Sequence, residues 1–380
     1  MRIALANHTP VIGSGSGTYT AMLARGLVRA GHEVCVVTPW AEKYPIDRAV
    51  AALSLQCPSE DFPSFTGHFL SATTYDRLGE PARAAWLAAW SDAFVKLRRT
   101  WAPEIVHVQH LWIVARAALS AGLRPVVTCH GSELRFAAEH PAEWRVVMPN
   151  VTDTLALIHI SKDVARSASS LSQQARRQVI MHNPYDDTMF FPEADYREDI
   201  TSRCIGFVGR LVPYKNCDQF LECVRQLQRS IPELTARVVG DGPERVRLEE
   251  VAESLHLRGV VRFLGHVPQA SLRQHYQSFN VVVVPSDHEP FGLVALEAAA
   301  CGTPVVVARS GGLRELIHPP FILGYRRDNM EELTRRTIEA MGQSRAPSFR
   351  GRSHQHVQLH YSLRSYVERL ESIYRSVRIR

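Results

Sequence analysis

The stretch Glu289-Pro-Phe-Gly-Leu-Val-Ala-Leu-Glu297 and its two flanking segments give the clearest indication of the fold. Two apolar runs, residues 280–285 and 303–307, flank the stretch and are typical of buried strands. The alanine-rich residues 294–301 between them favour a helix. The order strand, loop, helix, strand predicts one unit of a parallel sheet covered by helices.

The same stretch predicts a site for an anion. Gly292 lets the backbone come close to a ligand, and the free N–H groups at the start of the following helix favour negative charge. Glu289 is expected in the loop and Glu297 in the second turn of the helix. The two carboxylates can then reach different hydroxyls of one extended ligand.

Two cations about eighty residues upstream fit this site. Arg210 and Lys215 follow the apolar run Cys204–Val208, which places them in a loop at the carboxyl end of a strand. Arginine supplies a planar fork of donors and lysine a compact charge, and a diphosphate needs both. The alternative is that Arg210 and Lys215 lie on a solvated turn with no ligand. The presence of Glu289 and Glu297 disfavours it.

Strand-like runs alternate with helical stretches along the whole chain, which predicts an α/β fold with parallel sheets covered on both faces. The runs are residues 3–6, 34–38, 105–108, 125–128 and 155–158, then 204–208, 236–239, 260–264, 281–285 and 304–307. A chain of 380 residues exceeds the roughly 250–300 residues of a single core. A segment rich in Pro, Asp and Asn, residues 182–192, suits an interdomain connection. We therefore expect an N-terminal domain, 1–182, and a C-terminal domain, 183–360.

The last apolar pattern is helical. Residues 361–377 place large side chains at helical spacing, which predicts an amphipathic helix at about 361–380.

These motifs together resemble the retaining glycosyltransferases of family 4, whose signature is two glutamates separated by seven residues, with Phe/Tyr-Gly after the first. Segments 209–216 and 240–243 resemble the family's phosphate-binding element and second-domain turn, and segments 261–267 and 128–131 resemble the strand beside the base and a His-bearing loop. Residues 14–17 stand in the place of an early glycine turn. The resemblance covers nearly the whole chain.

The resemblance implies the GT-B fold: two Rossmann-like domains facing each other across a cleft, with the C-terminal helix returning to the first. It implies hexosyl transfer from a nucleotide-diphosphate sugar, held by the second domain, to a hydroxyl of an acceptor on the first. The catalytic residues by resemblance are His130, Arg210, Lys215 and Glu289. The donor-binding residues are Gly15, Ser16, Gly17, Arg210, Lys215, His266, Val267, Glu289, Phe291, Gly292, Leu293 and Glu297. Further acceptor candidates are His8, His110 and Glu133; Glu133 equally suits a cap on a helix.

No metal or other cofactor is expected to be required. The sequence has no Asp-x-Asp, so Arg210, Lys215 and the helix dipole are left to neutralise the departing diphosphate. The alternating glycines Gly13, Gly15 and Gly17 do not have dinucleotide spacing, and no acidic residue ends the second strand. A hydride-transferring dehydrogenase is therefore disfavoured, and a helix beginning near Thr18 is expected instead.

Two other functions stay open. One is a nucleotide-sugar epimerase or hydrolase of the same architecture, and the other is a catalytically silent nucleotide-sugar-binding subunit. We expect UDP rather than GDP on family frequency, and a small soluble metabolite or natural-product core as acceptor.

Composition and charge limit the compartment and the partners that we expect. No run of about 18 apolar residues is present, no signal peptide is apparent at the N-terminus, and seven cysteines include no Cys-x-x-Cys, which suits a reducing cytoplasm. The net charge of +6 is concentrated at the C-terminus, where residues 341–380 hold eight Lys/Arg and two Asp/Glu. This excess suits either a solvated face or peripheral contact with an anionic membrane. Aromatic and basic residues are not interleaved, so nucleic acid is not an expected partner.

Overall fold

The computed structural model describes residues 1–65, 68, 70–71, 73–148, 150–172, 174–193, 203–344 and 348–378. The chain forms two units. The first comprises Met1–Asn183 with Leu363–Arg380, and the second comprises Pro184–Ser362. The chain therefore leaves the first unit after Asn183 and returns to it at Leu363.

The first unit is built on a seven-stranded sheet in the order β3-β2-β1-β4-β5-β6-β7, in which all pairs are parallel. The strands are β1 (Arg2–Ala6), β2 (Glu33–Pro39), β3 (Val50–Leu55), β4 (Ile105–Gln109), β5 (Val126–Cys129), β6 (Ala156–His159) and β7 (Gln178–Ile180). The sequence patterns missed β3 and β7. Both lie at sheet edges and are partly exposed, so neither has the continuous apolar run of a central strand.

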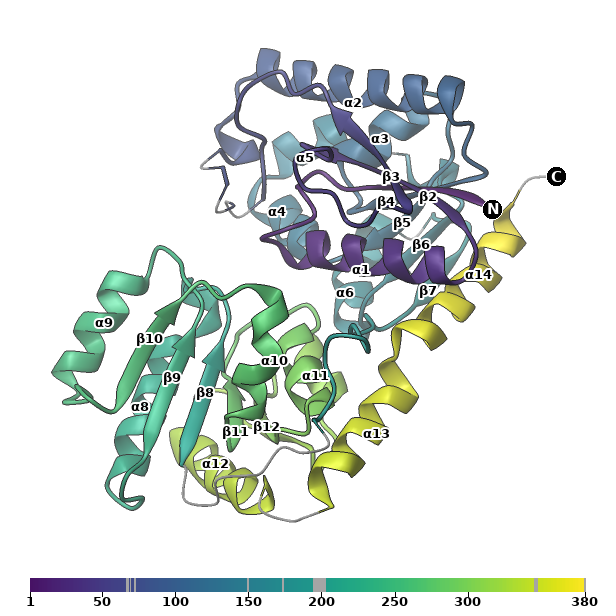
Figure 1. The fold of residues 1–380 in the computed structure, drawn as a ribbon. Coiled ribbons are helices and arrows are strands. Elements are labelled where there is room, and N and C mark those ends of the chain that lie inside the picture. Colours follow the sequence, from purple (N-terminus) through teal and green to yellow (C-terminus); the bar gives the residue numbers. More distant parts are fainter. Residues whose placement is uncertain are drawn as a thin grey trace. The chain divides into compact units, whose positions relative to one another are not determined.

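Helices cover both faces of this sheet (Figure 1). They are α1 (Gly15–Arg29), α2 (Glu80–Thr100), α3 (Ile113–Ser120), α4 (Ser132–Glu139), α5 (Pro141–Val147), α6 (Lys162–Ser167), α7 (Ser169–Ser172) and α14 (Leu363–Val377). Short 3-10 turns occupy Tyr75–Arg77 and Val151–Asp153.

The first helix begins earlier than the sequence suggested, at Gly15 and not near Thr18. Ser14 is its N-cap, and the Ser14 side chain accepts a hydrogen bond from the backbone N–H of Gly17 at 3.0 Å. A Cβ at Gly17 would lie 2.5 Å from the carbonyl oxygen of Pro10. Gly17 therefore allows close packing within the first turn of α1, so the glycines here do not form a loop ahead of the helix.

The last helix belongs to the first unit, as the resemblance implied. Helix α14 lies along α1, and its apolar face joins the same core (Figure 1). The hydroxyl groups of Tyr19 and Tyr366 are 2.7 Å apart, and the Tyr374 hydroxyl lies 2.6 Å from Nδ1 of His107. Helix α14 therefore contacts Tyr19 in α1 and His107 in β4, both of which lie close in sequence to candidate site residues.

The second unit repeats the arrangement with a six-stranded parallel sheet in the order β10-β9-β8-β11-β12-β13. Its strands are β8 (Cys204–Val208), β9 (Thr235–Val239), β10 (Val261–Gly265), β11 (Val281–Val284), β12 (Val305–Ala308) and β13 (Ile322–Tyr325). Its helices are α8 (Cys217–Gln228), α9 (Arg245–Ser254), α10 (Gln269–Gln277), α11 (Leu293–Ala300), α12 (Met330–Ser344) and α13 (Phe349–Tyr361). Further 3-10 turns occupy Pro213–Lys215 and Gly311–Leu316.

Both sheets share one strand order, which is that of the Rossmann fold. The chain therefore has the two-domain Rossmann-like architecture of the GT-B fold. In each sheet the order reverses between two neighbouring central strands, β1 and β4 in the first and β8 and β11 in the second. Ligands of open parallel sheets bind at the carboxyl ends of such strands.

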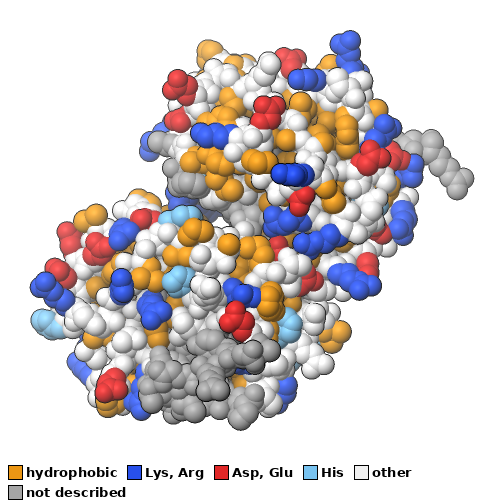
Figure 2. Space-filling view, in the orientation of Figure 1, with side chains coloured by type: hydrophobic (Ala, Val, Ile, Leu, Met, Phe, Trp, Pro, Cys, Tyr) orange, Lys and Arg blue, Asp and Glu red, His pale blue; other side chains and the backbone are white. Residues whose placement is uncertain are grey.

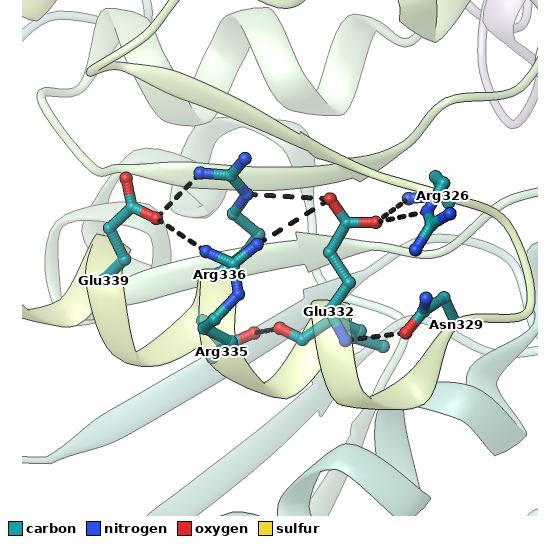
Figure 3. A network of polar contacts seen from close by, with 8 residues as sticks. Arg326, Asn329, Glu332, Arg335, Arg336 and Glu339 are labelled. Atoms are coloured by element: carbon teal, nitrogen blue, oxygen red, sulfur yellow. Dashed lines mark hydrogen bonds and ion pairs between the residues drawn. The ribbon is translucent and has the colours of Figure 1, made fainter.

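A polar network holds the start of α12 (Figure 3). Asn329 caps the helix by accepting from the backbone N–H of Glu332 at 2.8 Å, and Glu332 accepts from the backbone N–H of Arg326 at 2.8 Å. Arg335 and Arg336 lie between the carboxylates of Glu332 and Glu339. The network fixes the loop that follows β13.

Charged side chains of both signs are interspersed on the face shown in Figure 2. On α14, Arg364 pairs with Glu368 and Arg375 with Glu371, while Arg378 pairs with Glu104. Of these three pairs, only Arg378–Glu104 uses a carboxylate outside residues 341–380 and so reduces the basic excess of that segment. Among the described residues, no helix has the length and apolarity needed to cross a membrane.

Candidate functional site

The second unit gathers its candidate residues at the strands where the sheet order reverses. Strand β8 ends at Val208 and is followed by Arg210, whereas β11 ends at Val284 and is followed by Glu289. Because these strands are neighbours, the two loops lie at the same edge of the sheet.

Lys215 and Glu289 form a direct ion pair across these loops. Burial disfavours the charge on Lys215, but the Glu289 carboxylate and the nearby Tyr214 outweigh it, so the pKa of Lys215 is raised. Asn216 next to it has a left-handed backbone and donates through Nδ2 to the carbonyl of Pro285 at 3.1 Å. Lys215 is therefore charged, and it lies at the carboxyl ends of the strands of the second sheet.

Helix α11 begins at this place as the sequence predicted. Its N-cap is Gly292, whose φ of 109° favours glycine, and a Cβ there would lie 2.4 Å from Cδ2 of Leu313. Phe291 before it is buried, with 2% of its surface exposed. The first residue of the helix is Leu293, so free N–H groups of the first turn face the same edge as Lys215 and Glu289.

A glycine pair that the sequence analysis did not use completes this loop. The backbone N–H of Gly312 donates to the carbonyl of Glu289 at 2.8 Å, and a Cβ at Gly311 would lie 2.4 Å from the same oxygen. The sequence contains a signal for this contact, since two adjacent glycines in the loop after an apolar run indicate close backbone approach.

Glu297 lies in the second turn of α11 with 7% of its surface exposed. The Tyr276 hydroxyl donates to its Oε2 at 2.7 Å. Burial raises the pKa of Glu297 to about 7, Tyr276 partly offsets this, and Asp186 adds to the increase. The carboxyl group therefore changes charge near neutral pH. Tyr276 has no signal in the sequence, because its contact with Glu297 joins two helices.

His266 and Val267 follow β10, outside Gly265. The loops after β8, β9 and β10 meet through their backbones: the N–H of Gly240 donates to the Gly265 carbonyl at 2.8 Å. A Cβ at Gly240 would lie 1.9 Å from the carbonyl oxygen of Gly209. The glycines of these loops are thus required for their close approach.

The first unit brings its histidines together at the corresponding strand ends. His8 follows β1, His110 follows β4 and His130 follows β5. The ring centroids of His8 and His110 are 4.7 Å apart, and those of His110 and His130 are 4.8 Å apart. Three candidates that are far apart in sequence are therefore neighbours.

Glu133 holds two of these histidines at once. Its carboxylate lies 2.9 Å from Nδ1 of His110 and accepts from the backbone N–H of His130 at 2.9 Å. Glu133 lies in the first turn of α4 and is fully buried. It thus fills the first turn of α4 and fixes the loop before it.

His130 is buried, and its Nε2 lies 2.9 Å from Oε1 of Gln109. Burial, with the neighbouring His110 and His107, holds the pKa of His130 well below its usual range. His130 is therefore a neutral imidazole at pH 7, which interacts through hydrogen bonds and not through a full charge. Because an amide oxygen accepts, Nε2 is the protonated nitrogen of His130 in this contact.

Gly15 and Ser16 lie in the first turn of α1, and Asn7 at the end of β1 donates to the Ser16 hydroxyl at 3.3 Å. A Cβ at Gly15 would meet nothing within 4 Å, so Gly15 faces open space. The first turn of α1 thus lies at the same strand ends as His8.

Comparison with protein families gives two matches that together span most of the chain. Residues 13–188 match the family described as Glycosyltransferase Family 4, and residues 193–347 match the family described as Glycosyl transferases group 1.

Comparison with individual proteins also finds glycosyltransferases. The chain is 30% identical to the D-inositol 3-phosphate glycosyltransferase of Frankia alni over 335 residues, covering 80% of this chain and 79% of that one. Among solved structures it resembles sucrose-phosphate synthase from Thermosynechococcus elongatus, with a TM-score of 0.80, 21% identity and 99% of both chains covered. It also resembles the Anabaena protein HepE in complex with UDP-glucose, with a TM-score of 0.72, 17% identity and coverage of 99% and 100%.

Proposed function

This chain belongs to glycosyltransferase family 4, and on that basis we propose its donor and its acceptor. The chain is a glycosyltransferase with the GT-B fold. Its donor is, in our proposal, a nucleotide-diphosphate sugar, and its acceptor is a hydroxyl of a small metabolite or natural-product core.

The observation that supports the donor most directly is the cluster at the mouth of the second sheet. The Lys215–Glu289 ion pair lies in the loops at these strand ends, and the first two turns of α11, which include Glu297, follow the same loop. A cation and free N–H groups suit a diphosphate, and a carboxylate suits the vicinal hydroxyls of a ribose. We assign the diphosphate to Arg210, Lys215 and the start of α11, with Phe291, Gly292 and Leu293 lining it.

The remaining donor contacts follow from the same placement. Glu297 is assigned to the ribose, Glu289 to the donor sugar or its phosphates, and the backbone around His266 and Val267 to the base. In the first unit, Gly15, Ser16 and Gly17 are assigned to the donor because they form the start of α1, where Gly15 is exposed.

The reaction breaks the bond between the anomeric carbon and the diphosphate oxygen, and the electron pair leaves with the diphosphate. Negative charge on that oxygen grows in the transition state, where Arg210 and Lys215 stabilise it more than in the bound donor. We assign His130 to hydrogen bonding of the transferred sugar. The acceptor oxygen forms the new bond, on the same face in a retaining enzyme, and its proton passes to the departing diphosphate.

UDP is our proposed nucleotide and a hydroxylated ring our proposed acceptor, which we assign to His8, His110 and Glu133. The HepE structure contains UDP-glucose, and the Frankia alni relative is named for a cyclitol phosphate, which supports a UDP-sugar donor and a small acceptor here.

The test is a screen of UDP- and GDP-sugars with and without acceptors, measuring released nucleotide and new glycosides. Acceptor-dependent glycoside formation supports the proposal. Nucleotide release or a rearranged sugar without any acceptor supports the hydrolase or epimerase alternative. Tight nucleotide binding without turnover of any donor supports a silent subunit.

A further inference from the structure

Several buried polar atoms at the strand ends of the first sheet have no hydrogen-bond partner among the described residues. They are Nδ1 of His8, Nε2 of Gln109, Nε2 of His110 and Nε1 of Trp112. At most 5% of any of these side chains is exposed. Leaving a buried polar atom unpaired costs stability, so four together indicate that something else supplies their partners.

These groups form one cluster. The ring centroid of His8 lies 4.7 Å from that of His110 and 4.9 Å from that of Trp112. Phe65 packs on all three rings, at 4.3 Å from Trp112 and 5.4 Å from His110. Gln109 precedes His110 in the chain and is bonded to His130 through its oxygen. The unpaired atoms are thus placed next to aromatic faces.

The hydrogen-bonding roles of the cluster are mixed. The Glu133 carboxylate lies 2.9 Å from Nδ1 of His110, and Nε2 of an imidazole that carries its one proton on Nδ1 is an acceptor. The amide nitrogen of Gln109 and the indole nitrogen of Trp112 are donors. The backbone of His110 has a φ of 73°, a left-handed conformation that costs energy for a residue other than glycine and that clusters at functional sites.

The cluster does not contain a cation suited to a phosphate. The groups whose charge acts on His8 are His110, His68 and His130, all of them histidines. None of these is a lysine or an arginine. Arg83 lies one ring away, over Tyr75, which packs on Trp112 at 4.8 Å, but its guanidinium is 3.8 Å from the carboxylate of Glu143. Glu133, the carboxylate beside the cluster, is paired with His110.

We propose that His8, Gln109, His110 and Trp112 recognise the hydroxyls of an uncharged, ring-shaped polyol, which is the acceptor. A hydroxyl donates and accepts, so it matches a cluster with both kinds of unpaired atom, and the C–H face of a ring packs on Trp112 and Phe65. The proposal rests on the proposed function, because it names the acceptor of that reaction. It departs from the phosphorylated cyclitol in the name of the Frankia alni relative.

The first test separates recognition from packing. Trp112→Phe removes the unpaired indole N–H, and Trp90→Phe makes the same change at another fully buried tryptophan of the first unit, in α2. We expect Trp112→Phe to raise the acceptor KM at least tenfold while the Kd for UDP is unchanged, and Trp90→Phe to leave the acceptor KM unaltered. Equal effects of both variants on acceptor KM, or no effect of either, would overturn the proposal.

The second test uses matched rings with and without a phosphate: myo-inositol and its 3-phosphate, and glucose and glucose 6-phosphate. Each is added to the full-length protein with UDP, while the ring nitrogen signals of ¹⁵N-labelled histidines are recorded by NMR. At least one neutral ring should shift the signals of His8 and His110 more strongly than its phosphate ester does.

A response only to the phosphate esters would overturn the proposal. The absence of any response would also overturn it, and internal waters would then be the partners of the unpaired atoms. UDP binding is measured separately by calorimetry, so its failure would count against the proposed function and not against this inference.

Discussion

Glu297 has the environment of a carboxyl group whose charge matters for the ligand. One of its oxygens is bonded to Tyr276, and burial raises its pKa to about 7. An ionised carboxylate accepts from ribose hydroxyls more strongly than a protonated one does. Donor affinity and protein stability should therefore depend on pH with opposite signs.

We expect UDP affinity to fall as pH drops below 7, by up to about tenfold per pH unit as Glu297 becomes protonated. The stability of the protein without UDP should depend on pH in the opposite direction. The folded pKa is raised above the unfolded value, so the contribution of Glu297 to stability is present below the unfolded pKa and lost as pH rises through about 7. Calorimetry and thermal unfolding from pH 5 to 8 measure both trends. Glu297→Gln, which cannot titrate, should flatten both; unchanged slopes in that variant would remove Glu297 from the site.

Lys215 forms an ion pair with Glu289. We expect Lys215→Ala and Arg210→Ala to lower kcat, on the order of a hundredfold, more than they raise the donor KM, because negative charge grows as the diphosphate departs. Steady-state kinetics with the active donor measure the split. Arg262→Ala, an exposed cation on β10, is the control. An increase in KM alone for both site variants would contradict the assignment.

His130 belongs to the first unit, whereas the diphosphate site is assigned to the second. We expect His130→Ala to bind UDP with unchanged affinity yet transfer sugar at a much lower rate. Calorimetry and product formation measure the two effects independently. Loss of UDP binding, or transfer at the wild-type rate, would show that His130 is not at the reaction centre.

At the scale of elements, the start of α11 depends on one glycine. Gly292 has a φ of 109° and no room for a Cβ beside Leu313. We expect Gly292→Ala to destabilise the protein by about 1–3 kcal/mol, because both the conformation and the contact become strained. Its UDP affinity should fall as well, since the helix start moves.

Gly351 is a matched control within α13, where a Cβ would meet nothing within 4 Å. Gly351→Ala should stabilise the protein by about 0.5–1 kcal/mol, because alanine is the better helix residue. Chemical denaturation compares the two. If Gly292→Ala were as stable as Gly351→Ala, the left-handed cap would not be needed.

Other elements are set by contacts between distant segments. The loop after β13, held by the network of Figure 3, carries Arg327, whose Nε lies 2.9 Å from Oδ1 of Asp287 in the loop before α11. In the first unit, Tyr374 of α14 reaches His107, whose other ring nitrogen lies 2.7 Å from the hydroxyl of Thr128 on β5. The site loops therefore rest on elements that contain no site residue.

At the scale of the whole molecule, the prediction concerns metal. The chain has no Asp-x-Asp, and the charges assigned to the leaving group are those of Arg210, Lys215 and the start of α11. We expect treatment with EDTA to leave at least most of the turnover intact, measured with the donor that the screen identifies. Complete loss of activity that Mg²⁺ or Mn²⁺ restores would contradict a metal-independent reaction.

The central strands of both sheets and the helix after Gly292 were predictable, because buried parallel strands are continuous apolar runs and helix starts have local signals. The edge strands β3, β7 and β13 were not. β3 and β7 are half-exposed and lack such runs, and β13 is buried but short and contains Gly324. The start of α1 was misplaced because its cap, Ser14, and the packing of Gly17 on Pro10 were not considered.

The family, the alternation of central strands with helices and the residues expected at the strand ends could be read from the sequence, because each depends on local patterns of apolar, glycine and charged residues. Only the tertiary structure decided the partners and charge states of those residues. Tyr276 and Glu297 are on different helices, and Glu133 meets His110 across two loops. Whether Glu297 is ionised or His130 neutral depends on burial, and burial is created when distant segments pack together and exclude water.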